Sequence, residues 1–133
     1  MQRTQLTRLC ALVAFALLAS CDTRVPTAPP FDTQVINLRN DLALQITGLE
    51  DATSDLEYTW QNDGTAASVT QSPTLLTGTA LLFVLDGAGV QVYQRSLAEN
   101  GTFTTTAGVP GNWTVRVRFT EANGSVTFRL KNP

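Results

Sequence analysis

The segment from residue 113 to residue 120 reads WTVRVRFT, and it decides the fold class. Every second side chain in it is apolar, namely Trp113, Val115, Val117 and Phe119. The side chains between them are polar: Thr114, Arg116, Arg118 and Thr120. A period of two places one set on each face of a β-strand, so the pattern predicts a strand with one face in a core and the other in solvent.

The same alternation recurs along the chain after residue 34. Further predicted strands lie at residues 35–38, 42–46, 56–60, 66–71, 80–85, 90–92, 102–106 and 126–130. Residue pairs that favour tight turns stand between them: Asp63-Gly64, Asp86-Gly87, Asn100-Gly101, Pro110-Gly111 and Asn123-Gly124. This spacing predicts an all-β domain, a single antiparallel β-sandwich of jelly-roll or immunoglobulin-like type with about eight or nine strands.

Two finer predictions follow from the pattern. In each predicted strand, the apolar side chains of the alternating pattern should point into the core. The core is therefore predicted to contain Leu44, Ile46, Leu82, Val84, Trp113, Val115, Val117 and Phe128. The Asn123-Gly124 pair predicts a hairpin that joins residues 113–119 to residues 126–130.

Three stretches resemble the small β-sandwich modules of secreted bacterial proteins, notably the pre-peptidase C-terminal type. They are DLALQI at residues 41–46, LLFVLD at residues 81–86 with Gly89, and PGNWTVRV at residues 110–117 running into GSVTFRL at residues 124–130. The resemblance covers roughly residues 34–131 and implies a jelly-roll sandwich that serves as an accessory or targeting module without an active site. Those modules accompany enzymes, whereas this domain follows an export signal.

The export signal is predicted at residues 1–20, as a helical signal peptide. Arg3 and Arg8 precede an apolar run, LCALVAFALLA at residues 9–19. This run is too short to cross a bilayer but has the length of the apolar region of a signal peptide. The sequence LASC at residues 18–21 resembles the lipobox of bacterial lipoproteins. That resemblance implies a diacylglyceryl group on Cys21, attachment to a membrane, and a place in the bacterial cell envelope. The alternatives are an ordinary secretory signal that leaves Cys21 as a free thiol, and a buried apolar helix.

Residues 21–33 are predicted to be a tether and residues 34–133 the sandwich domain. Pro26, Pro29 and Pro30 favour an extended polyproline conformation in the tether. With Cys10 removed in the leader and Cys21 lipidated, the mature domain has no thiol for a disulfide, a nucleophile or a metal site.

Composition argues against catalysis and nucleic-acid binding. The chain has no histidine, and loss of Arg3 and Arg8 with the leader takes its net charge from −2 to −4. A negative chain with scattered arginines lacks the basic face that phosphate neutralisation needs. We predict no enzyme activity, no cofactor, no metal site and no nucleic-acid partner.

Acidic residues cluster in one stretch, at Glu50, Asp51, Asp55, Glu57 and Asp63. Carboxylates that converge on one point suit a calcium ion, which binds about six to eight oxygen ligands. The stretch lacks a calcium-loop motif, however, and the simpler interpretation is a solvated acidic loop. A glycosidase pair is a further, weaker alternative, because a domain of this size offers no deep cleft.

Two further groups of side chains suit ligand binding. Trp60 and Trp113, with Tyr58, suit a sugar-binding platform, but their phase matches the aliphatic inner face and favours the core. Arg116, Arg118 and Arg129 have the outward phase, and the predicted hairpin places all three on one solvent face. There they either meet a partner or keep the sheet soluble.

These observations favour a lipid-anchored, non-catalytic binding module for a protein or a polysaccharide. The alternative is a purely structural envelope lipoprotein without a specific ligand, and a small hydrolase is the weakest interpretation.

Overall fold

The computed structural model describes residues 31–133, and the predicted leader and most of the predicted tether lie outside these residues. The described chain is all-β. Its six strands are β3 (Asp32–Leu38), β4 (Asp41–Asn62), β5 (Ser68–Leu85), β6 (Gln91–Ser96), β7 (Gly101–Thr104) and β8 (Gly111–Lys131). Every pairing is antiparallel, in the order β3-β4-β8-β5-β6, with β7 also on β5. No helix in residues 31–133 has the length and apolar character of a membrane span.

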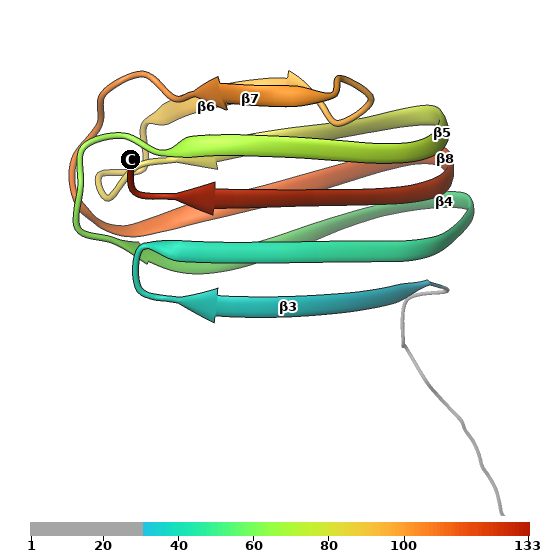
Figure 1. Ribbon diagram of the computed structural model, residues 1–133, viewed down its shortest axis with the longest axis horizontal. Coiled ribbons are helices and arrows are strands. Elements are labelled where there is room, and N and C mark those ends of the chain that lie inside the picture. The colour runs from blue at the N-terminus through green and yellow to red at the C-terminus, as the bar shows by residue number, and fades with distance from the viewer. Residues whose placement is uncertain (1–30) are drawn as a thin grey trace, which may run out of the picture.

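The sandwich arises because the three long strands each run through both of its layers. Residues 41–46 of β4 pair with residues 126–131 of β8, whereas residues 54–62 of β4 pair with residues 111–119 of β8. Strand β5 divides in the same way. Figure 1 shows the long strands turning at one end of the molecule and returning behind themselves. We call the layer with β3 and β7 the first layer and the layer with β6 the second layer.

This arrangement confirms the predicted fold class, with one change in connectivity. Each of the three long strands contributes one segment to each layer. Together with the three short strands this makes nine strand segments, within the predicted eight or nine. The predicted strands at residues 42–46 and 56–60 are two halves of β4, and those at residues 66–71 and 80–85 are two halves of β5. Strand β3 begins at Asp32, two residues before the predicted domain boundary.

The bend between the layers depends on residues with left-handed backbone conformations. Register shifts interrupt β4 between Ile46 and Ser54 and interrupt β5 between Thr74 and Thr79. Gly78 has a φ of +80°, and a Cβ there would lie 2.0 Å from the carbonyl oxygen of Glu121. β-bulges of this kind bend and twist a sheet, which lets each long strand fold back on itself.

The predicted hairpin at Asn123-Gly124 is wrong. Residues 113–119 and 126–130 do not pair with each other, because each segment lies between β4 and β5 in a different layer. Gly124 has a φ of +116° at the bend of the continuous strand β8. Asn-Gly does accept positive φ here, but a bend within a strand needs the same freedom as a hairpin turn.

The predicted core is confirmed. All eight predicted side chains are at most 1% exposed: Leu44, Ile46, Leu82, Val84, Trp113, Val115, Val117 and Phe128. Trp60 and Trp113 are opposite each other in register and pack edge to face, with ring centroids 6.0 Å apart. Their indole N–H groups donate to the carbonyl oxygens of Leu38 and Val109. Since both tryptophans are fully buried, the alternative of a tryptophan platform for sugars is wrong.

Candidate functional site

The three predicted arginines lie on two opposite faces of the sandwich. Arg116 and Arg118 pair in register with residues 55–57 of β4, so they stand on the outer face of the second layer. Arg129 pairs with Ala43 and Thr70 and stands on the outer face of the first layer. The prediction that all three share one face is therefore wrong, because β8 crosses between the layers after Phe119 instead of turning back beside itself. Their outward direction is as predicted, since each side chain is between 38% and 51% exposed.

Each of these arginines forms an ion pair with a carboxylate of β4. The distances are 2.7 Å from Arg116 to Glu57, 3.1 Å from Arg118 to Asp55 and 2.6 Å from Arg129 to Asp41. Exposed pairs of this kind each contribute about 0.2–1 kcal/mol to stability. The hydrogen bond from Arg129 lowers the pKa of Asp41, and the same contact raises the pKa of Arg129.

The outer face of the second layer combines these ion pairs with apolar side chains. Glu57, Arg116 and Phe83 lie in register across β4, β8 and β5. Asp55, Arg118 and Leu81 form the next such row. We call these six residues the arginine face.

The arginine face includes an aromatic ring on β5, next to the two arginines of β8. Phe83 is half-buried, and the guanidinium carbon of Arg118 lies 5.5 Å from the centroid of its ring. A hollow of about 300 Å³ adjoins this face at the bend, lined by Thr53, Ser54, Asp55, Arg118, Phe119 and Thr120. The ring of Phe83 offers apolar surface to a partner, and the guanidinium groups of Arg116 and Arg118 offer hydrogen-bond donors. Because strands hold all three side chains in place, one partner can contact them together.

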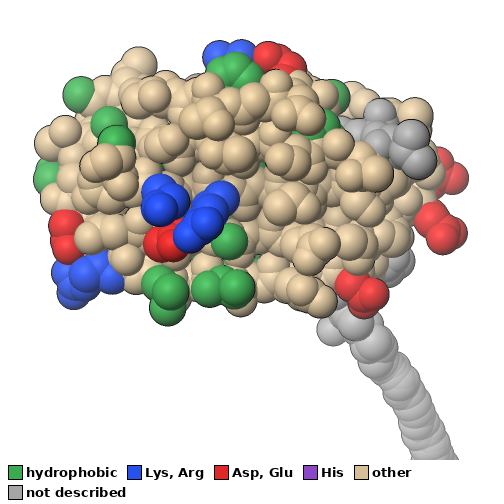
Figure 2. Space-filling view, viewed as in Figure 1, with side chains coloured by type: hydrophobic (Ala, Val, Ile, Leu, Met, Phe, Trp, Pro, Cys, Tyr) green, Lys and Arg blue, Asp and Glu red, His purple; other side chains and the backbone are tan. Residues whose placement is uncertain are grey.

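The outer face of the first layer has a different chemistry. Hydroxyl side chains from β5, β7 and β8 line it, namely Ser68, Thr70, Ser72, Thr74, Thr102, Thr104, Ser125 and Thr127. We call these eight residues the hydroxyl face. Figure 2 shows this side of the molecule as mostly uncharged polar surface with a few small charged groups. The hydroxyls of Thr70 and Thr102 bond to each other at 3.2 Å.

The acidic stretch does not converge on one point. Asp55 and Glu57 bond to arginines of β8, and Asp63 bonds to Arg39 at 2.9 Å. Asp51 instead accepts a hydrogen bond from the side-chain amide of Asn123 at the bend. Within residues 31–133 no group of three or more acidic side chains is arranged to hold a metal ion. The calcium and glycosidase alternatives therefore receive no support from the geometry.

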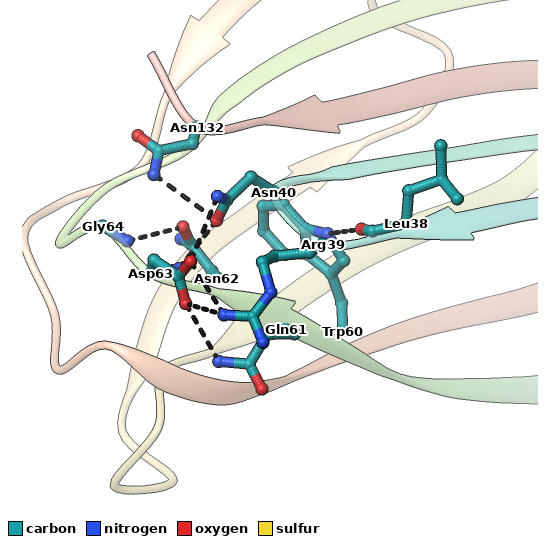
Figure 3. Close-up of polar contacts among 9 residues, drawn as sticks. All are labelled: Leu38, Arg39, Asn40, Trp60, Gln61, Asn62, Asp63, Gly64 and Asn132. Atoms are coloured by element: carbon teal, nitrogen blue, oxygen red, sulfur yellow. Dashed lines mark hydrogen bonds and ion pairs between the residues drawn. The ribbon is translucent and has the colours of Figure 1, made fainter.

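A polar network that the sequence analysis missed lies at the end of the sandwich opposite the bend (Figure 3). The side-chain oxygen of Asn40 accepts a hydrogen bond from the backbone N–H of Asp63 at 2.7 Å, and the amide of Asn132 approaches the same oxygen. Hydrogen bonds from Arg39, Gln61 and Asn40 lower the pKa of Asp63. Asn40 has a φ of +64°, so an asparagine between two strands was the available signal. The network joins the β3–β4 turn, the β4–β5 loop and the C-terminal end, and its groups bond to one another.

Fold and surface together define a β-sandwich whose outward side chains differ strongly between its two faces. No family model matches the chain, and no curated protein matches it. Among solved structures, one described as "CBM4 structure and function" is similar, with a TM-score of 0.41 and 10% sequence identity over 74% of this chain and 77% of that chain. This similarity is too distant to carry a ligand or a site from that protein to this one.

Proposed function

We propose that this chain is a lipid-anchored, non-catalytic binding module of the bacterial cell envelope, and that its arginine face binds a protein partner. The observation that carries the proposal is the ring of Phe83 on a rigid sheet face, with Arg116 and Arg118 beside it on the neighbouring strand. Aromatic and arginine side chains contribute most of the binding energy in many protein interfaces, and a sheet positions them before the partner arrives.

A protein fits this face better than a polysaccharide does. Sugar rings stack on broadly exposed aromatic surfaces, whereas both tryptophans are buried in the core and Phe83 is half-buried beside Arg118. The arginine face instead alternates guanidinium groups with the carboxylates of Asp55 and Glu57. Alternating charges of opposite sign favour a partner with the complementary pattern and oppose a partner without it.

The lipid anchor rests on LASC at residues 18–21 and on the apolar run before it. One acyl chain gives only marginal membrane binding, whereas the two or three chains of a modified cysteine give a stable anchor. Growth of a bacterial host with labelled palmitate tests this part. Label is expected in the wild type and in Cys10→Ala, and no label in Cys21→Ala. An unlabelled wild type would contradict the anchor.

Binding by the arginine face is tested with two charge reversals on opposite faces. Arg116→Glu places a carboxylate beside Glu57, and Arg129→Glu does the same beside Asp41. Each variant loses one exposed ion pair, so the two are matched in their cost to the fold. In pull-downs from envelope extract we expect saturable binding that Arg116→Glu weakens about tenfold or more and that Arg129→Glu leaves unchanged.

Two results would contradict the assignment. Equal weakening by both variants places the partner elsewhere, and a purely structural role predicts no saturable binding by the wild type. A parallel array of polysaccharides separates the two ligand classes, because the proposal predicts a protein signal and no glycan signal.

A further inference from the structure

Strand β3 forms the outer edge of the first layer and carries much of the exposed apolar surface. Within residues 31–133 it pairs with β4 alone, and Figure 1 shows it at the lower edge of the nearer layer. Ile36 is 62% exposed, Leu38 58% and Val35 39%. An edge strand presents a row of unpaired N–H and C=O groups, which is a template for another strand.

Within residues 31–133, this edge lacks the devices that usually prevent strand pairing. Proteins protect exposed edges with proline, lysine, β-bulges or very short strands. Strand β3 has seven residues, DTQVINL, and pairs with β4 without a register shift. Its one charged residue, Asp32, stands at its first position.

Two contacts to the second layer hold β3 in a fixed position. The side-chain amide of Asn37 donates to the carbonyl oxygen of Thr59 at 2.9 Å, and the indole of Trp60 donates to the carbonyl oxygen of Leu38 at 3.1 Å. Because Asn37 points toward the second layer, alternation directs Gln34, Ile36 and Leu38 to the outer face. The edge is therefore pre-organised, so a pairing strand does not have to order it first.

We propose that two copies of this chain pair through β3, in antiparallel orientation around a twofold axis perpendicular to the first layer. In such a pair, facing residues must point to the same side of the sheet, so Ile36 can face Ile36 of the second copy. This register places Leu38 opposite Gln34 of the second copy and covers the most exposed apolar side chain of the strand with its own equivalent.

The ends of β3 favour a second copy over an unrelated strand. The register centred on Ile36 brings Asp32 close to the β3–β4 turn of the second copy, which carries Arg39. Arg39 pairs with Asp63 of its own chain, yet its side chain is 67% exposed, so it can accept Asp32 as a second carboxylate partner, and the symmetric contact forms twice. Opposite charges at both ends and apolar side chains at the centre make the edge self-complementary. The two first layers then form one continuous sheet, and both second layers lie on the same side of it.

Cysteine cross-linking of the full chain tests the pairing and its register. With Ile36→Cys, mild oxidation is expected to give a disulfide-linked product of twice the chain mass. Gln34→Cys lies on the same face of the same strand, but two such residues stand about four positions apart in the proposed register, which exceeds disulfide reach. It should give no such product, and the wild type controls for Cys10 and Cys21.

Sedimentation over a concentration series gives an independent measurement on the full chain in detergent. Ile36→Lys places two ammonium groups opposite each other and removes apolar contact, so we expect the dimer to weaken about tenfold or more. Val90→Lys changes a residue that is 59% exposed on the β5–β6 loop and should sediment as the wild type. Three outcomes would overturn the proposal: a monomer at every concentration, equal cross-linking from both cysteine variants, or cross-linking of Ile36→Cys to a different protein only.

Discussion

The two outer faces of the sandwich share the same three long strands, yet they carry different chemistry. Before its bend β5 directs Ser68, Thr70 and Ser72 outward, and after the bend it directs Leu81, Phe83 and Leu85 outward. The inward set is mostly apolar in both halves because both halves cover one core, and Gln71 is the buried polar exception on β5. The alternation of a strand therefore fixes which residues reach solvent, whereas the kind of surface depends on which half of the strand they occupy.

Removal of a core side chain that both layers share should have the largest effect. Trp113 is fully buried and donates from its indole to the carbonyl oxygen of Val109. We expect Trp113→Ala to lower the free energy of unfolding by about 3–5 kcal/mol, because it leaves a large cavity in the core. The carbonyl oxygen of Val109 also loses one of its two hydrogen bonds and keeps the one from the backbone N–H of Gly87. Denaturant unfolding measures the change. A loss below about 1 kcal/mol would contradict the placement of this ring between the layers.

The bend that separates the two faces should tolerate a side chain at one glycine and not at another. A Cβ at Gly78 would lie 2.0 Å from the carbonyl oxygen of Glu121, whereas a Cβ at Gly48 would have no atom within 4 Å. Both residues have positive φ. We expect Gly48→Ala to cost about 1–2 kcal/mol from backbone strain alone, and Gly78→Ala about 2–4 kcal/mol from strain and overlap. Thermal unfolding of the two variants compares them directly, and equal losses would argue against the close approach at Gly78.

These bends also explain what the sequence could and could not predict. The core residues of β8 were predictable because a period of two is a local signal. The placement of Arg129 was not, because Asn123-Gly124 suits a hairpin and a bend equally. The carboxylate partner of Arg116 lies 59 positions away in β4, and a single strand contains no signal for such a partner.

The position of Phe83 and the polar network around Asn40 and Asp63 could not be predicted either, because both depend on contacts between distant parts of the chain. Residues 80–85 are apolar throughout, so their sequence did not distinguish the core side of β5 from its solvent side. Asn40 and Asp63 meet only because two loops close at one end of the sandwich.

Low pH should weaken the ion pair between Arg129 and Asp41, which lies on the same side of the sandwich as the hydroxyl face. The hydrogen bond from Arg129 holds the pKa of Asp41 below its ordinary value of 3.8. Because the folded pKa is the lower one, the pair stabilises the fold above the unfolded pKa and loses this contribution as the pH falls through the folded pKa. In an NMR titration we expect Arg129→Gln to raise the pKa of Asp41 toward 3.8 and Arg116→Gln to leave it unchanged. A shift in both variants would contradict the separation of the two faces.

Loss of single exposed ion pairs should have the smallest effect on stability. We expect Arg116→Ala and Arg129→Ala each to lower the free energy of unfolding by about 0.2–1 kcal/mol, because solvent screens both pairs. Equal, small losses in denaturant unfolding would show that a difference in partner binding between the two sites does not come from unfolding. A loss well above this range in one variant would reveal a second role for that arginine in the fold.

Site-specific photocross-linking in the bacterial envelope tests the central claim most directly. A photoreactive phenylalanine derivative is placed at Phe83 on the arginine face or at Thr70 on the hydroxyl face. Both positions lie on β5 and both side chains point outward, so the two probes differ mainly in the face that they report. We expect one protein adduct of defined mass from position 83 and none from position 70. Adducts from position 70 alone, or from neither position, would contradict it.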